Sequence, residues 1–272
     1  MALLIANAVL AWKQYRVQPM SAVGEGSADP WPNEPHGFTV ISDYGFDDTI
    51  PATSDALTLG RSGWRVQWNP LGNGSRIADR GAPFSPPAVY QVKYPVGFAD
   101  GAAPSTLEYT LSPHVKELYW GFWWKPSNPF QSDGSGVNKI AFLWTPSGRT
   151  DLLYFDLSPN PWRIRCMNDL NAGRGPSAGT RLEPNVTTTV IALGQWHRIE
   201  MHLKYSTGDL ADGILKWWVD GVLNGVYANL QMVQDGGFDH VQFAPTFGGA
   251  QGDRKRQVDY YWFDHSHMSR RP

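Results

Sequence analysis

Short apolar runs recur along the chain, and clusters of glycine, proline, asparagine and aspartate separate them. β-Branched and aromatic residues dominate these runs, which is typical of half-buried strands. The predicted strands are Phe38–Ser42, Gly63–Trp68, Val89–Tyr94, Thr106–Leu111, Leu118–Lys125, Asn138–Trp144, Asp151–Leu157, Trp162–Met167, Thr187–Ala192, His197–Tyr205, Ile214–Val219, Val222–Ala228, Val241–Thr246 and Val258–His265. This pattern predicts an all-β fold, an antiparallel jelly-roll sandwich of two sheets.

The clearest local prediction is a tight hairpin at Asp220-Gly221, which lies between two apolar runs. Asp-Gly supplies the two positive-φ residues of a two-residue turn. Alternation also places Arg163 and Arg165 on one face of their strand, opposite Ile164 and Cys166. No repeat or heptad is visible in the sequence, which excludes solenoids, propellers and coiled coils.

Composition narrows the class of protein further. The 13 tryptophans are too many to lie mainly on a surface, so most are expected in the core. The net charge is −2 and the basic residues are spread along the chain, which argues against a nucleic-acid partner. Cys166 is the single cysteine, so no internal disulfide can form, and we expect it in the core.

The N-terminal residues differ from the rest of the chain. Residues 1–36 are expected to form an arm that ends in a proline-rich stretch, and residues 37–272 the jelly-roll domain. The apolar start Met1–Trp12 has no preceding basic residue and is too short to span a membrane, so it predicts neither a signal peptide nor a membrane span. An extracellular or particle-surface location is nevertheless expected from the fold class.

Three stretches carry a resemblance to a known family. They are Gly136–Trp144, Gly194–His202 followed by Asp212–Gly221, and Phe243–Gly249 with Asp259–Asp264. In order and spacing they resemble the concanavalin A-like polysaccharide lyases, especially family-14-type alginate and glucuronan lyases and laminin-G-like jelly rolls. The resemblance implies a sandwich whose concave sheet forms a groove for a sugar chain.

The resemblance also implies candidate catalytic residues. Lys139 falls on the family's groove lysine, although the Ser-x-Arg pair of the next strand is missing and Arg163-Ile-Arg165 occupies the strand of the family's tyrosines. β-Elimination from a uronate needs a cation for the carboxylate, a base for the C5 proton and an acid for the leaving oxygen. Lys139, Tyr154, Arg163 and Arg165 could supply these roles. The structural alternative is that they are solvated polar residues of a half-exposed sheet.

Other residues are candidates for binding. Trp120, Trp124 and Arg149 are the candidate substrate-binding residues, since indole faces pack well on sugar rings. Folds of this class often bind a structural calcium where the first and last strands meet, which nominates Asp47 and Asp264. The expected cofactor is therefore calcium at most.

Two functional hypotheses stay open. The first is a jelly roll that binds a polysaccharide, neutral or anionic, with lyase activity an open question. The second is a non-catalytic module of an assembly, such as a virion decoration or fibre protein, which docks on other subunits through residues 1–36.

Overall fold

The computed structural model describes residues 29–146, 152–169, 181–232, 236–249 and 252–272. The chain divides into two units, Met1–Pro32 and Asn33–Pro272, and the second unit contains all the strands of the described residues. No helix in this part of the chain could cross a membrane. Most of the expected arm lies outside the described residues. The assembly hypothesis depends on that arm and stays a prediction.

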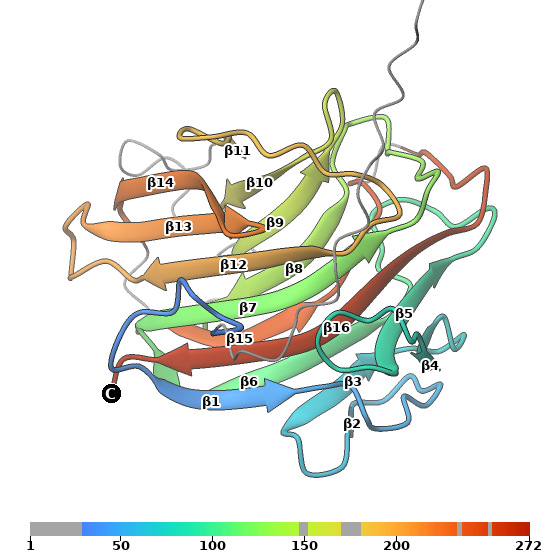
Figure 1. Cartoon of the computed structure of the whole chain (residues 1–272), viewed down its shortest axis with the longest axis horizontal. Helices are drawn as coiled ribbons and strands as arrows, with labels where there is room; N and C mark the ends of the chain where they lie inside the picture. Colours follow the sequence, from blue (N-terminus) through green and yellow to red (C-terminus); the bar gives the residue numbers. More distant parts are fainter. Residues whose placement is uncertain (1–28, 147–151, 170–180, 233–235, 250–251) are drawn as a thin grey trace, which may run out of the picture. The chain divides into compact units, whose positions relative to one another are not determined.

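The first sheet contains the long C-terminal strand. Its members are β1 (Thr39–Tyr44), β4 (Gly74–Ala78), β5 (Ala88–Tyr94), β7 (Glu117–Pro126), β12 (His197–Lys204), β13 (Gly213–Val219), β14 (Val222–Leu230) and β16 (Asp259–Arg270). They follow the order β14-β13-β12-β7-β16-β5-β4, and β1 pairs with the C-terminal half of β16 (Figure 1).

The second sheet lies behind the first in the view of Figure 1. Its members are β2 (Leu57–Thr58), β3 (Trp64–Trp68), β6 (Thr106–Val115), β8 (Lys139–Trp144), β9 (Leu152–Ser158), β10 (Arg163–Asn168), β11 (Arg181–Leu182) and β15 (Phe238–Phe243). The order is β11-β10-β9-β8-β15-β6-β3-β2. All pairings in both sheets are antiparallel, so the predicted two-sheet sandwich is confirmed.

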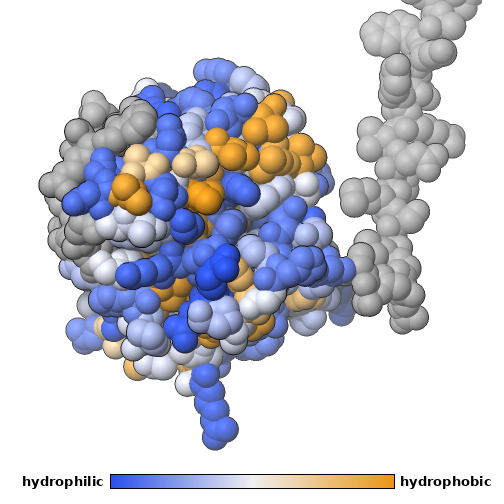
Figure 2. Space-filling model, turned by 90° about the vertical axis from the view of Figure 1, so that its left-hand side faces the viewer, coloured by the Kyte–Doolittle hydropathy of each residue, from blue (hydrophilic) through white to orange (hydrophobic). Residues whose placement is uncertain are grey.

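The space between the sheets is filled with aromatic side chains, as the tryptophan content predicts. Trp120 of the first sheet and Trp64 of the second both pack on Phe243, at ring-centroid distances of 5.1 and 5.4 Å. Cys166 is fully buried in the same hydrophobic core. On the side of the molecule that Figure 2 shows, hydrophilic surface dominates, and the largest group of hydrophobic residues lies at the upper right.

Two local predictions have opposite outcomes. The Asp220-Gly221 hairpin is confirmed, with φ angles of 52° and 81° between β13 and β14. The strand predicted at Thr187–Ala192 is wrong, because this segment is not part of a sheet. Its backbone bonds elsewhere: the Thr189 amide donates to the Asn224 side chain, and the Ile191 amide donates to the Trp162 carbonyl.

Candidate functional site

The outer face of the second sheet contains a groove with a volume of about 840 Å³. Strands β3, β6, β8 and β15 contribute its side chains, since every second residue of these strands points away from the core. The residues that line the groove are Arg65, Gln67, Glu108, Thr110, Leu111, Ser112, Pro113, His114, Trp144, Asp239, His240 and Gln242.

Hydrogen bonds across four neighbouring strands hold the groove floor in place. The Trp144 indole N–H donates to Gln242 Oε1 at 2.8 Å, and Gln242 Nε2 donates to Glu108 Oε2 at 2.6 Å. The Arg65 guanidinium donates to the other oxygen of Glu108, with its Nε at 2.8 Å. Because Glu108 and Gln242 are buried, these bonds satisfy groups that would otherwise be costly to bury.

A row of rings leads from the groove towards the adjoining strands. His240 stacks on Trp144 with centroids 5.6 Å apart, and Trp144 stacks on Phe142 at 5.8 Å. Phe142 contacts Tyr154 of β9 at 5.4 Å. Beyond this ring row, the Lys139 ammonium lies 5.1 Å from the Tyr154 ring centroid.

Lys139 and Tyr154 have shifted acidities with the same physical cause. Burial lowers the pKa of Lys139, while the charges of Asp156, Asp169 and Asp133 oppose that shift. Burial raises the pKa of the Tyr154 hydroxyl, and the charge of Asp156 adds to the effect. Tyr154 is therefore protonated at neutral pH and can donate a proton but not remove one.

Asp156 lies between two cations in the strand register. It is paired directly with Lys139 of β8 on one side and with Arg165 of β10 on the other. Arg165 Nε donates to Asp156 Oδ1 at 2.7 Å, and both side chains are buried. Burial raises the pKa of Asp156 to about 6, although the Arg165 charge opposes it.

The two arginines of β10 lie on the same face, as alternation predicts. Ile164 lies between the two arginines and Cys166 follows the second, and both of these residues belong to the core. Arg163 bonds to Glu183 at 3.0 Å, and Arg165 also donates to the Gly136 carbonyl at 2.9 Å. Both arginines are thus held by protein partners.

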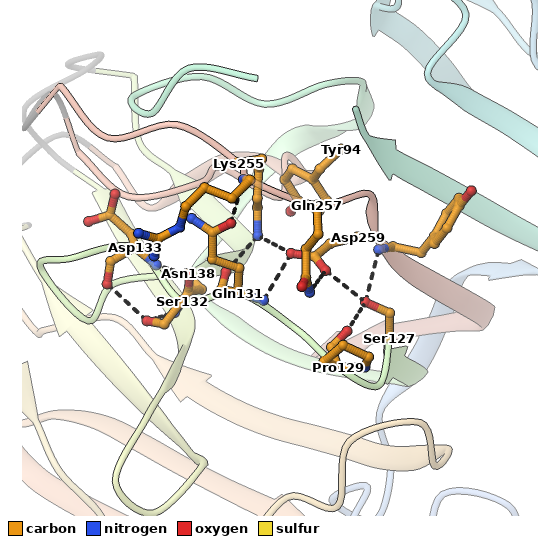
Figure 3. A network of polar contacts seen from close by, with 12 residues as sticks. Tyr94, Ser127, Pro129, Gln131, Ser132, Asp133, Asn138, Lys255, Gln257 and Asp259 are labelled. Carbon is orange, nitrogen blue, oxygen red and sulfur yellow. Dashed lines mark hydrogen bonds and ion pairs between the residues drawn. The ribbon is translucent and has the colours of Figure 1, made fainter. Parts of the chain in front are cut away.

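A polar network fixes the loop that leads into Lys139 (Figure 3). The Lys255 ammonium donates to Asp259 and to the Gln131 carbonyl, both at 2.7 Å. Further along the loop, the Asn138 side chain donates to the Leu157 carbonyl at 2.9 Å. This network anchors both ends of the segment between β7 and β8, so Lys139 enters β8 at a defined position.

Two predicted substrate contacts are wrong. Trp120 and Trp124 are both completely buried between the sheets, so neither can meet a sugar ring. Alternation along β7 turns them towards the core and turns Trp123 outward. The third predicted contact, Arg149, lies outside the described residues.

The two aspartates nominated for calcium do not form an evident ion site. Asp264 accepts backbone N–H bonds from Phe84 at 2.6 Å and from Ser85 at 3.0 Å with separate oxygens, so it already holds a loop. Asp47 is exposed. Within the described ranges no three histidine, cysteine, aspartate or glutamate side chains could hold a metal together. Calcium binding stays a prediction.

Comparison with known proteins adds information about the fold. No protein-family model matches the chain, and no curated protein matches it. Among solved structures, the marine PL-14 alginate lyase from Aplysia kurodai has a TM-score of 0.61 at 13% identity, covering 85% of this chain and 98% of that one. Alginate lyase Aly36B has a TM-score of 0.56 at 16% identity, covering 74% and 84%.

A variant of Aly36B has also been solved in complex with an alginate trisaccharide, and it matches with a TM-score of 0.56 at 13% identity, covering 84% of this chain and 98% of that one. At such identities these matches establish the fold alone. They confirm the resemblance to concanavalin A-like polysaccharide lyases as a likeness of architecture.

Most residues of the groove could not be predicted from the sequence. Arg65, Glu108, His240 and Trp144 belong to four strands that are distant in the sequence, and the sheet order alone makes them neighbours. The one available signal was the alternation of polar residues in Thr106–Leu111 and Val241–Thr246, which places Glu108 and Gln242 on outward faces.

Proposed function

We propose that the groove on the outer face of the second sheet binds a polysaccharide chain. The observation that carries this proposal is the stacked pair of His240 and Trp144, whose half-buried rings line the groove; the buried rings of Phe142 and Tyr154 support this pair and lead to the Lys139 end of the face. Aromatic faces pack well on the C–H faces of sugar rings. Polar side chains beside such a row can bond the sugar hydroxyls.

The fold supports the same proposal. The structures it resembles include alginate lyases, and one of these was solved with a bound alginate trisaccharide. Lys139 occupies the position that the sequence resemblance assigns to the groove lysine. This chain would therefore use the same face of the sandwich for its own glycan.

A pair of matched tryptophan variants tests the proposal. Trp144 bonds to Gln242 on the outer face of the second sheet, and Trp262 bonds to Gln91 at 3.0 Å on the outer face of the first. In titration calorimetry against a panel of oligosaccharides, we expect Trp144→Ala to weaken binding by about tenfold or more. Trp262→Ala should bind like the wild type. Equal losses in both variants, or no binding by the wild type, would contradict the proposal.

Lyase chemistry is a second candidate, favoured by the geometry around Lys139. The protonated Tyr154 hydroxyl would donate to the leaving oxygen. The Lys139 amine, whose pKa burial lowers, would take the C5 proton. A cation for the uronate carboxylate would have to come from Arg165, which is already paired with Asp156.

An absorbance assay tests this second candidate. Elimination from a uronate creates a conjugated double bond that absorbs ultraviolet light. An increase in absorbance with alginate, glucuronan or pectate that both Lys139→Ala and Tyr154→Phe abolish would establish a lyase. A wild-type protein that binds glycans without any such increase would be a binding protein.

A further inference from the structure

Three arginines on the outer face of the second sheet are already neutralised by carboxylates of the protein. Each of three guanidinium groups has a carboxylate partner from a neighbouring part of the same face. The pairs are Arg65 with Glu108, Arg163 with Glu183 and Arg165 with Asp156. Arg165 also lies 3.6 Å from Glu183, so this carboxylate is shared by two arginines.

Lys139 is the exception, because it forms no ion pair with any described residue. Three carboxylates nonetheless act on its charge, those of Asp156, Asp169 and Asp133. Asp169 is half-buried, and Lys139 is the charge that favours its ionised form. A carboxylate of a ligand that approached Lys139 would therefore also meet the repulsion of these three groups.

At the other end of the groove, carboxylates also surround the basic group. His240 Nδ1 is bonded to Asp239 at 2.6 Å, and its Nε2 lies 3.8 Å from Glu108. These two carboxylates lie on either side of the imidazole. An anionic sugar in this part of the groove would face Asp239 and Glu108 without a cation to spare, since Arg65 is bonded to Glu108.

We infer that the polysaccharide taken by this groove is built of uncharged sugars and is neither a polyuronate nor a sulfated chain, which argues for a binding role and against the lyase candidate. The inference rests on the proposed function and names its ligand class. A surface that binds a polyanion needs a surplus of positive charge to attract the chain and to replace its water. Among the residues that line the groove, Arg65 is paired with Glu108, and Asp239 adds a further carboxylate.

The same face has the groups that an uncharged sugar chain requires. The rings of Trp144 and His240 offer stacking surfaces, and Gln67, Thr110 and Ser112 line the groove beside them. Compensated ion pairs are also good partners for hydroxyl groups, because a hydroxyl can donate to the carboxylate and accept from the guanidinium. The groove can therefore replace most of the hydrogen bonds to water that a neutral sugar chain gives up when it binds.

Calorimetric titration of the full chain with chosen oligosaccharides tests the inference. The probes are neutral β-glucan and galactomannan oligomers, alginate oligomers and a heparin fragment of equal length. We expect a neutral oligomer to bind at least about tenfold more tightly than either anionic one, with little change between low and high salt. Tighter binding of alginate or heparin, weakened steeply by salt, would overturn the inference and leave the groove as the proposed site.

A matched pair of charge variants sharpens the test. Glu183→Gln removes the half-exposed carboxylate that two arginines share, and Asp79→Asn removes the partner of Lys125 on the other sheet. We expect Glu183→Gln to raise alginate affinity about fivefold while neutral-oligomer affinity stays constant, and Asp79→Asn to change neither. A Glu183→Gln protein with unchanged alginate affinity would contradict the charge argument. Failure of every glycan to bind would overturn both this inference and the proposed function.

Discussion

Lys139 and Lys255 are two lysines that lie near aromatic rings, but their surroundings differ. The Lys255 side chain is fully buried, bonds to Asp259 at 2.7 Å and lies 3.9 Å from the Phe130 ring centroid. Lys139 is only partly buried, lies farther from its rings, and has no ion-pair partner in the described residues. Burial lowers the pKa of both, to about 8 for Lys255.

The difference separates a structural lysine from one that is available to a ligand. The hydrogen bonds of the Lys255 ammonium join Gln131, in the loop after β7, to Asp259 at the start of β16, as Figure 3 shows. Lys139 begins β8 at the edge of the ring row, and its ammonium keeps hydrogen-bonding capacity. Position in the fold, and not residue type, decides which lysine can take part in binding.

The largest expected effect follows from removing the structural lysine. Lys255→Met leaves the Asp259 carboxylate buried without its cation, which should lower the free energy of unfolding by about 3–5 kcal/mol. Urea unfolding followed by tryptophan fluorescence would measure it. Lys139→Met is the matched control and should cost less than about 1 kcal/mol. Similar losses of unfolding free energy in the two variants would contradict the distinction between a structural lysine and a ligand-facing one.

A smaller effect is expected from the acidity of Asp156. Because its pKa is raised from 3.8 to about 6, the folded protein binds this proton more tightly than the unfolded chain. Its contribution to stability is therefore most favourable below pH 4 and is lost as the pH rises towards 6, by about 1–3 kcal/mol. Asp156→Asn should abolish this part of the pH dependence in unfolding experiments between these values. A wild-type protein whose stability rises through this window with the same slope as the variant would contradict the assignment.

The ligand-facing lysine should affect binding more than stability. Lys139→Ala removes a charged hydrogen-bond donor from the far end of the ring row, and we expect oligosaccharide affinity to fall by about tenfold. Lys125→Ala is the control, since Lys125 lies 4.6 Å from the Trp196 ring centroid on the outer face of the other sheet. Unchanged affinity in Lys139→Ala would show that this end of the ring row does not contact the glycan.

The smallest effect is expected at Tyr154. Tyr154→Phe keeps the ring and removes only the hydroxyl, so glycan affinity should stay within about threefold of the wild type. The same variant would abolish product formation if the protein is a lyase, because its acid would be missing. Affinity and absorbance measured on one preparation therefore separate stacking from catalysis. A large loss of affinity would show that the hydroxyl, and not the ring, makes the contact.

The parts of the fold that depend on local pattern could be predicted from the sequence. The Asp220-Gly221 turn and the shared face of Arg163 and Arg165 follow from turn chemistry and strand alternation. Thr187–Ala192 has the β-branched composition of a strand, but the Asn224 side chain bonds to Thr189, and the Ile191 amide bonds to the Trp162 carbonyl. Propensity alone could not reveal that competitor.

The candidate site depended on information that no single segment contains. Alternation predicts an inward and an outward set of aromatic residues on the strand Leu118–Lys125, but it does not reveal which set faces the other sheet. The predicted substrate contacts of Trp120 and Trp124 are wrong for this reason. Glu108 and Gln242 are 134 residues apart in the chain and become hydrogen-bond partners only because β6 and β15 are neighbours. Strand order is a tertiary property, and the groove follows from it.

The most direct test of the central claim is to observe the groove while a glycan binds. In nitrogen–proton correlation spectra, the indole signals of Trp144 and Trp262 can be assigned by substituting each residue with phenylalanine. During titration with a neutral oligosaccharide, we expect the Trp144 signal to shift progressively to saturation while the Trp262 signal stays in place. A shift of Trp262 without one of Trp144, at an oligosaccharide concentration that saturates binding, would place the site on the other sheet and contradict the account.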